Sequence, residues 1–485
     1  MLFNSLEFAI FFPIIFILYW FVFNKNLKSQ NILILISSYI FYGWWDYRFL
    51  GLIILSTIVD YFIGIKVYNS KEKSYQKLFL WISVIFNLSV LCVFKYYSFF
   101  VESFIEFFTF FGYSLKNSWT INIILPVGIS FYTFQTMSYT IDIYRKNLAP
   151  TKNFISFASF VSFFPQLVAG PIERASNLLP QILKERKFEY KQAIQGLRLI
   201  LWGMFKKVVI ADSLAPTVNQ IFENYNTLNS TTLLLGAIYF SFQIYCDFSG
   251  YSDIAIGTSK VLGFELMSNF KTPYFSRNIG EFWRRWHISL STWFRDYLYF
   301  PLGGSKFSKL KSIRNIFIIF LVSGFWHGAN WTFIFWGLIH AMLYIPSFLF
   351  KTNRNYVSAV VAENKNFPTL KEIYQILTNY FFVTIAWIFF RSSSINEAFS
   401  YLKKMFSFDF STNEGELGTF SFLNLNLTVV GFIIIEWLIR NNERDIYSFL
   451  KDKHIIRYSS YLIISIIIIY KYILNDKASF IYFQF

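Results

Sequence analysis

The sequence predicts an all-α, polytopic membrane protein, and three features of the chain lead to that class. Of its 485 residues, 55% are hydrophobic and 22% are aromatic, and the mean hydropathy is +0.42. Such a composition is too apolar for a soluble protein of this size. The apolar residues also fall in runs near the length of about 20 residues that crosses a bilayer. We expect about 11 to 13 spans or half-spans in one domain that covers residues 1–485.

Cysteine content, charge and the absence of common motifs exclude several other classes. The two cysteines, Cys92 and Cys246, lie in apolar runs, so neither a disulfide framework nor a thiolate metal site is expected. The formal net charge is +16, but the basic residues lie in short loops between apolar runs, which argues against nucleic-acid binding. No glycine-rich phosphate loop, HExxH helix or GxSxG elbow supports a kinase, metalloprotease or ordinary hydrolase.

The chain opens with four apolar runs, which are Leu6–Phe23, Asn31–Trp45, Leu50–Ile65 and Leu78–Phe100. The first run begins almost at Met1 without a basic segment before it, so we interpret it as a spanning helix rather than a cleavable signal peptide. Lysines gather in the loops Asn24–Gln30 and Lys66–Lys77. Because positive charge favours the cytosolic side, these loops are expected in the cytosol and the N-terminus outside.

The next segments combine apolar sequence with helix-breaking residues. Ile121–Arg145 contains Pro126, and Phe154–Arg174 contains Pro165 and further glycine and proline. Broken helices are tolerated in a membrane where they line a cavity or pack against protein, so either segment is a broken, re-entrant helix or a kinked packing helix. The basic segment Lys184–Lys207 follows, and we expect it at the membrane interface or in the cytosol.

The second half of the chain alternates apolar runs with charged loops. The expected spans are Thr232–Tyr245, Ile313–Trp326, Trp331–Leu349, Ile373–Phe390, Leu425–Ile439 and Ile455–Leu474. The loop Phe406–Phe422 carries acidic residues and no basic residue, which suits the outer side.

The ionisable residues gather in two stretches, and these are the candidate sites of chemistry. Glu281–Gly304 packs arginines and His287 among tryptophans, although an ionisable group near hydrocarbon is costly. The second stretch, SGFWHGANW, places His327 among glycine and apolar residues. A buried neutral imidazole can act as a general base, although a helix–helix hydrogen bond is the simpler interpretation. His340 has the features of a packing histidine, and His454 those of a solvated one.

The arginines of the first stretch are candidates for binding phosphates. His287 has Arg284, Ser291 and Arg295 at helical spacing, which would form one polar face. Planar guanidinium groups suit phosphates, and an enzyme that uses an acyl-coenzyme A would need them, so Arg284, Arg285 and Arg295 are candidate donor-binding residues. A basic rim beside lipid headgroups is the alternative.

A transport function is also compatible with these features. Histidines in broken transmembrane helices occur in proton-coupled transporters and flippases as well as in membrane enzymes. Composition does not separate the two classes.

Three motifs resemble a known family closely. They are VAGPIER (Val168–Arg174), FWRRWHISLSTWFRDYLYFPLGG (Phe282–Gly304) and SGFWHGANWTFIFWG (Ser323–Gly337). Together they look like the membrane-bound O-acyltransferase (MBOAT) superfamily. The chain further resembles its bacterial branch, which includes alginate and peptidoglycan O-acetyltransferase membrane subunits and the teichoic-acid D-alanylation membrane protein. The opening MLFNSLEFAIFFPI and the ending FIYFQF fit the same branch.

The resemblance implies a fold, a reaction and partners. It implies a multi-helix fold with a central tunnel, His327 as the catalytic histidine and His287 as the second histidine of the branch. The implied reaction moves an acyl group, such as acetyl, from a cytosolic thioester donor such as acetyl-CoA to an extracytoplasmic polysaccharide, with no bound cofactor or metal. The implied setting is a bacterial inner membrane with an extracytoplasmic SGNH-hydrolase-like acyltransferase partner.

The last residues, 478–485, form an aromatic tail with a candidate acyl carrier. Phe480, Tyr482 and Phe485 match an F-x-Y-x-x-F pattern that, in the D-alanylation system, is proposed to carry the acyl group on its tyrosine. We therefore expect Tyr482 to be an acyl relay, with Ser479 as the competing hydroxyl. The alternative is that the aromatic side chains only anchor the terminus at the interface. In either case burial in a groove or tunnel is expected, because exposed aromatic rings are costly.

Overall fold

A computed structural model describes residues 1–113, 123–168, 170–306, 308–357, 359–363, 365–409, 419–442, 447, 450, 452–474 and 480–481, with the backbone alone at 419–421. Within these ranges all regular structure is helical. Six helical stretches among the described residues are long and apolar enough to cross a membrane, and Leu6–Val22 and Phe154–Leu167 are shorter apolar ones. The predicted class of an all-α, multi-pass membrane protein is confirmed.

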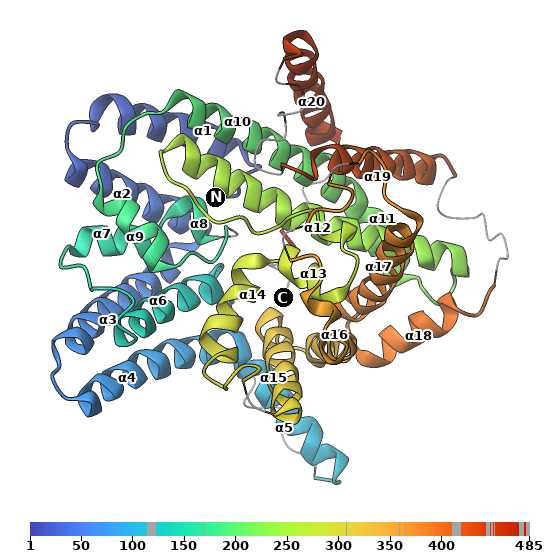
Figure 1. The fold of residues 1–485 in the computed structure, drawn as a ribbon, viewed down its shortest axis with the longest axis horizontal. Helices are drawn as coiled ribbons and strands as arrows, with labels where there is room; N and C mark the ends of the chain where they lie inside the picture. Colours follow the sequence, from blue (N-terminus) through green and yellow to red (C-terminus); the bar gives the residue numbers. More distant parts are fainter. Residues whose placement is uncertain are drawn as a thin grey trace. The chain divides into compact units, whose positions relative to one another are not determined.

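Figure 1 shows the order of the helices along the chain. Those of the first half are α1 (Leu6–Ile17), α2 (Leu27–Asp46), α3 (Leu50–Asn69), α4 (Lys73–Leu91), α5 (Tyr97–Phe110), α6 (Ile129–Tyr144), α7 (Phe154–Val161), α8 (Phe164–Leu167), α9 (Ala175–Leu183), α10 (Tyr190–Met204) and α11 (Asp212–Glu223). Those of the second half are α12 (Ser230–Val261), α13 (Ile279–Arg285), α14 (Ile288–Phe294), α15 (Lys309–His327), α16 (Trp331–Leu349), α17 (Leu370–Arg391), α18 (Ile395–Met405), α19 (Thr419–Ile439) and α20 (His454–Leu474). The π-helical turns are Leu18–Val22, Cys92–Tyr96, Phe205–Ala211 and Arg295–Tyr299, and the 3-10 turns are Tyr47–Phe49, Pro273–Phe275 and Thr352–Arg354.

The chain divides into two compact units. Unit 1 consists of Met1–Ile194 with Thr258–Met267, and unit 2 of Gln195–Gly257 with Ser268–Phe485. Both histidines that the motifs single out lie in unit 2. The expectation of one catalytic domain over residues 1–485 stays a prediction.

A buried carboxylate joins three helices of unit 1. Helices α3, α4 and α6 pack against one another (Figure 1), and Asp60 of α3 is completely buried between them. Its carboxylate accepts hydrogen bonds from Ser83 Oγ at 2.5 Å, Asn87 Nδ2 at 2.8 Å and Thr140 Oγ1 at 3.2 Å. Because a buried carboxylate is stable only when it is hydrogen-bonded, this network fixes the three helices together.

Both apolar segments with helix breakers are interrupted, which favours the broken helix over the kinked packing helix for each. In the first, helix α6 begins only at Ile129, directly after Gly128 with a φ of +74°. The second is split into the short helices α7 and α8 and ends in an irregular stretch that contains Glu173. The buried Glu173 carboxylate accepts from Asn177 Nδ2 at 2.6 Å and from the Met267 backbone N at 2.5 Å. The VAGPIER motif therefore clamps the end of this segment within unit 1.

The last two lysines of the basic segment Lys184–Lys207 are buried in the protein. Lys206 and Lys207 are 4% and 1% exposed, so their side chains are enclosed by protein and not solvated. The interfacial or cytosolic position of the segment Lys184–Lys207 stays a prediction. Both lysines lie in the π-helical turn after α10, whose apolar neighbours carry both side chains into unit 2. Their ion pairs join Lys206 Nζ to Asp253 at 2.6 Å, and Lys207 Nζ to Asp212 at 2.7 Å and Asp247 at 2.8 Å.

Helices α15 and α16 of unit 2 pack closely because each presents a glycine to the other. A methyl group at Gly337 would lie 2.2 Å from the Phe320 backbone oxygen, and one at Gly324 would lie 2.2 Å from that of Phe333. Small residues permit such approach between helices in membrane proteins. The pair matters for the site because α15 ends at His327.

Gly337→Ala is expected to destabilise the protein by about 1–3 kcal/mol, since the added methyl group forces the backbones of α15 and α16 apart. Thermal unfolding of the purified protein in detergent measures the change as a lower Tm. Gly431→Ala is the matched control, because no described atom lies within 4 Å of a Cβ at that position on α19. Equal Tm values for the two variants would contradict the close packing of α15 and α16.

Candidate active site

His327 lies at the end of α15 in an aromatic enclosure. Its side chain is almost fully buried, and its ring centroid lies 5.1 Å from those of Trp326 and Trp336 and 5.4 Å from that of Phe390. The next residue, Gly328, is extended, and a Cβ there would lie 2.1 Å from the Phe333 ring. Glycine at that position therefore lets the chain leave α15 without displacing the aromatic side chains.

His287 lies at a break between two short helices, not on one continuous helix. Helix α13 ends at Arg285 and α14 begins at Ile288, and His287 between them has a φ of +41°. The expected single polar face of His287 with Arg284, Ser291 and Arg295 is therefore wrong. A non-glycine residue in the left-handed region is strained, and such strain is typical of functional sites.

Asn269 fixes the orientation of the His287 ring. His287 Nδ1 lies 3.1 Å from Asn269 Oδ1, and the same oxygen accepts hydrogen bonds from the backbone N and the Oγ of Ser289 at 3.3 and 2.9 Å. Asn269 Nδ2 donates to Ser252 Oγ at 3.0 Å. With Asn269 Oδ1 as the acceptor, Nδ1 of His287 carries the proton and Nε2 carries the lone pair. This is the tautomer that a general base or a hydrogen-bond acceptor requires at Nε2.

The two histidines lie near each other inside unit 2. Their ring centroids are 6.3 Å apart, and Trp326 contacts both rings. His287 is completely buried and lies outside the candidate spanning helices. Burial lowers the pKa of His287 to about 3, so its ring is neutral at physiological pH. The sequence therefore brings together two enclosed imidazoles, His287 and His327, from motifs about 40 residues apart.

The other two histidines occupy different surroundings. His340 is completely buried on α16, where its ring lies 4.7 Å from Trp336, 5.0 Å from Trp283 and 6.1 Å from Phe282. His454 is exposed at the start of α20. These settings favour a packing role for His340 and a solvated role for His454, as the sequence predicts.

The three arginines predicted to bind the donor contact protein groups in this structure. Arg284 donates to the backbone oxygens of Asn353 and Asn355 at 2.6 and 2.7 Å. Arg285 pairs with Glu281 at 3.0 Å, and the exposed Arg295 pairs with the adjacent Asp296 at 2.8 Å. Arg284 and Arg285 thus hold the loop after α16 and helix α13, and donor binding by the three arginines stays a prediction.

The C-terminal tail is described at Phe480 and Ile481. Both are buried, with exposed fractions of 0% and 3%, so the predicted burial of the tail is confirmed at these two residues. The Phe480 ring lies 6.0 Å from that of Phe248, and Phe248 lies 4.6 Å from the His287 ring. The tail thus reaches the surroundings of His287. Tyr482 and Ser479 lie outside the described residues.

Two groups of residues in this region are not predicted from the sequence. One is Asn269, which orients His287. It lies before the central motif, and nothing in the sequence around it indicates a contact with His287. The other is the contact of Lys207 with Asp247. A signal existed for it, because two adjacent lysines occur in apolar sequence (GMFKKVVIAD) and two aspartates in another apolar stretch (CDFSGYSD).

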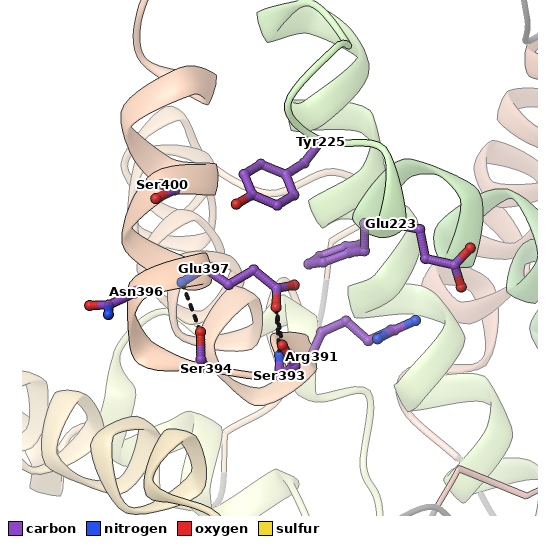
Figure 2. Close-up of a pocket in the computed structure, with 9 residues that line it drawn as sticks. Glu223, Tyr225, Arg391, Ser393, Ser394, Asn396, Glu397 and Ser400 are labelled. Atoms are coloured by element: carbon purple, nitrogen blue, oxygen red, sulfur yellow. Dashed lines mark hydrogen bonds between the residues drawn. The ribbon is translucent and has the colours of Figure 1, made fainter.

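A polar pocket of unit 2 lies at the junction of α11, α17 and α18 (Figure 2). Its volume is about 520 Å³, and it is lined by Phe222, Glu223, Tyr225, Arg391, Ser393, Ser394, Asn396, Glu397 and Ser400. Figure 2 shows Glu397 turned toward Ser393, with which its carboxylate is hydrogen-bonded. The lining contains no histidine, so the pocket is a separate feature from the histidine pair.

Comparison with known proteins finds relatives over most of the chain. The MBOAT, membrane-bound O-acyltransferase family matches residues 39–396. The chain is 38% identical over 412 residues to the probable alginate O-acetylase AlgI of Azotobacter vinelandii, covering 84% of this chain and 79% of that protein. It is 35% identical over 435 residues to the peptidoglycan O-acetyltransferase of Helicobacter pylori, covering 84% and 80%.

A more distant relative is the teichoic acid D-alanyltransferase of Bacillus subtilis. It is 32% identical over 249 residues, which cover 48% of this chain and 62% of that protein. The family match includes both His287 and His327 and extends over most of the chain. The chain therefore belongs to the membrane-bound O-acyltransferase family, and it is a multi-pass membrane O-acyltransferase.

Proposed function

We propose that this protein moves an acetyl group from a cytosolic acyl thioester, such as acetyl-CoA, across the membrane for O-acetylation of an extracytoplasmic polysaccharide. The observation that carries the proposal is the pair of enclosed histidines, His287 and His327, with ring centroids 6.3 Å apart. The names of the relatives support acetyl as the acyl group and a cell-envelope glycan as the final acceptor. These relatives come from bacteria, and we therefore propose a bacterial inner membrane as the location.

His327 is the proposed general base. As the accepting hydroxyl attacks the thioester carbonyl, the His327 imidazole takes its proton, and the new ester C–O bond forms while the C–S bond breaks. The thiolate leaves and takes up the proton from the imidazolium. The aromatic enclosure of His327 excludes water, which protects the thioester from hydrolysis.

His287 is the proposed orienting partner. Asn269 holds its Nδ1 proton, so Nε2 can accept a hydrogen bond from the attacking hydroxyl or stabilise the proton on His327. Arg284, Arg285 and Arg295 are the proposed contacts for the donor phosphates, which would replace their present protein partners.

Tyr482 is the proposed hydroxyl that first accepts the acetyl group. A phenyl ester is a more reactive donor than an alkyl ester, because a phenol with a pKa near 10 leaves more readily than an aliphatic alcohol. We propose that an extracytoplasmic SGNH-hydrolase-like acyltransferase then takes the acetyl group from Tyr482 and transfers it to the glycan.

Reconstitution into liposomes tests the proposed function. Acetyl-CoA radiolabelled in its acetyl group is added from outside, where it reaches the fraction of molecules with their cytosolic side facing out. Radiolabel is expected to become covalently attached to the protein. The alternative result is that label enters the lumen as free solute without covalent attachment to the protein. If that flux depends on a proton gradient, the protein is a transporter instead. The Cys-free variant serves as a control, because it removes the thiols of Cys92 and Cys246 as alternative sites of acetylation.

A further inference from the structure

The ion-pair network around Lys207 has a feature that packing alone does not explain. Lys207, Asp212 and Asp247 are 1%, 4% and 3% exposed, so two carboxylates and one ammonium group are buried together in unit 2. Lys207 Nζ lies 2.7 Å from Asp212 Oδ1 and 2.8 Å from Asp247 Oδ1. A buried carboxylate needs hydrogen bonds to both oxygens, and this arrangement uses only one oxygen of Asp247 for the lysine.

The second oxygen of Asp247 is used by the C-terminal tail. The backbone N of Ile481 donates to Asp247 Oδ2 at 2.7 Å, over a sequence separation of 234 residues. A hydrogen bond to a charged acceptor is stronger than one between neutral groups. Lys207 holds the carboxylate through Oδ1, so Oδ2 is presented to the tail in a fixed position.

An aromatic slot beside the network holds the preceding residue. The Phe480 ring is completely buried, with its centroid 4.4 Å from that of Tyr251 and 6.0 Å from that of Phe248. Lys207 Nζ also lies 5.6 Å from the centroid of the Tyr251 ring, so the slot and the network share a wall. One face of the same region adjoins the proposed active site, because the Phe248 ring centroid lies 4.6 Å from that of His287.

We propose that Asp247, held by Lys207 and Asp212, is a docking site for the chain's own C-terminal segment. The site takes an aromatic side chain in the slot formed by Phe248 and Tyr251 and the following backbone N–H on Asp247 Oδ2. It places Phe480 next to the surroundings of His287, through Phe248, and Tyr482 follows two residues later in the sequence. Asp247 is thus a positioning residue. Docking of this segment does not depend on the proposed function. Its importance for acyl transfer rests on the proposed relay by Tyr482.

Thiol labelling of the full-length protein in detergent tests the docking site without any acyl donor. The parent protein carries Ile481→Cys in a background without Cys92 and Cys246, and a maleimide reports how often position 481 becomes accessible. The backbone N–H of residue 481 remains in this variant. Asp247→Ala is expected to increase the labelling rate about ten- to a hundredfold, the range that corresponds to loss of a hydrogen bond to a charged group.

Three further variants make the result specific. Phe480→Ala empties the slot without changing any ion pair, and it is expected to increase labelling even if Asp247→Ala folds poorly. Asp247→Glu keeps the carboxylate and should label more slowly than Asp247→Ala. Asp60→Asn is the matched control, because this carboxyl group is equally buried and its hydrogen-bond partners Ser83, Asn87 and Thr140 all belong to unit 1. Its labelling rate should equal that of the parent.

Two results would overturn the docking site. One is slow labelling in both Asp247→Ala and Phe480→Ala, and the other is an equal increase in Asp60→Asn, which would indicate general loosening. Tyr482→Phe separates docking from the relay, because it retains the Phe480 ring and the Ile481 N–H. Slow labelling of that variant with normal transfer would overturn the relay and leave the docking site standing.

Discussion

His327→Ala is expected to abolish acyl transfer, with a loss of about 10²- to 10⁴-fold, the usual cost of removing a general base. The reason is structural as well as chemical. His327 is enclosed by Trp326, Trp336 and Phe390, so water has little access to replace the missing imidazole. Transfer is measured as radiolabel from acetyl-CoA attached to the protein in liposomes, normalised to the amount of folded protein.

Two other histidine variants show whether the loss of transfer in His327→Ala is specific to that residue. His340→Ala removes an equally buried imidazole that is packed between Trp283 and Trp336, so it should lower stability more than transfer per folded molecule. His287→Ala should impair transfer less than His327→Ala, since His287 orients or assists. Activity above about a tenth of the wild-type value in His327→Ala, or a greater loss in His340→Ala, would show that the base is a different residue.

The sequence predicted those features that depend on local composition. Apolar runs gave the membrane class, because about 20 apolar residues are needed to cross a bilayer whatever the tertiary structure. Prolines and glycines predicted the interruptions before α6 and between α7 and α8. Such residues break a helix through the backbone of their own segment, so their effect can be predicted locally. His327 could be selected because glycine surrounds it and a specific motif contains it.

The features that the sequence did not predict depend on partners distant in the chain. The helical spacing around His287 suggested one polar face, yet the backbone turns at His287, where Asn269 binds the ring and accepts from the next turn. The run of basic residues in Lys184–Lys207 predicts an interfacial or cytosolic segment, and it does not reveal that Lys206 and Lys207 are buried in the protein. Aspartates from α11 and α12 pair with them: the buried Asp212 and Asp247 with Lys207, and the partly buried Asp253 with Lys206. A single sequence does not show that pairing.

Tyr482→Phe is expected to reduce transfer to the extracytoplasmic acceptor as severely as His327→Ala. The exchange removes one hydroxyl group and keeps the aromatic ring, so packing of the tail should persist. The two described residues of the tail support this separation of roles. Phe480 fills the aromatic slot and the Ile481 N–H binds Asp247, and neither contact involves the Tyr482 hydroxyl. A pure anchor would therefore tolerate the exchange, whereas a relay would not.

Mass spectrometry of the protein after incubation with acetyl-CoA locates the acyl group directly. Acetyl is expected on Tyr482 in the wild-type protein and in Ser479→Ala, and it should be absent in Tyr482→Phe and in His327→Ala. The His327 variant matters most in this comparison, because it retains the tyrosine but lacks the base that deprotonates it. Acetyl on Tyr482 in that variant would mean that the phenol reacts without His327, and acetyl on Ser479 alone would assign the relay to the other hydroxyl. Wild-type transfer by Tyr482→Phe would leave the tail as an anchor, held at Asp247 for a structural reason only.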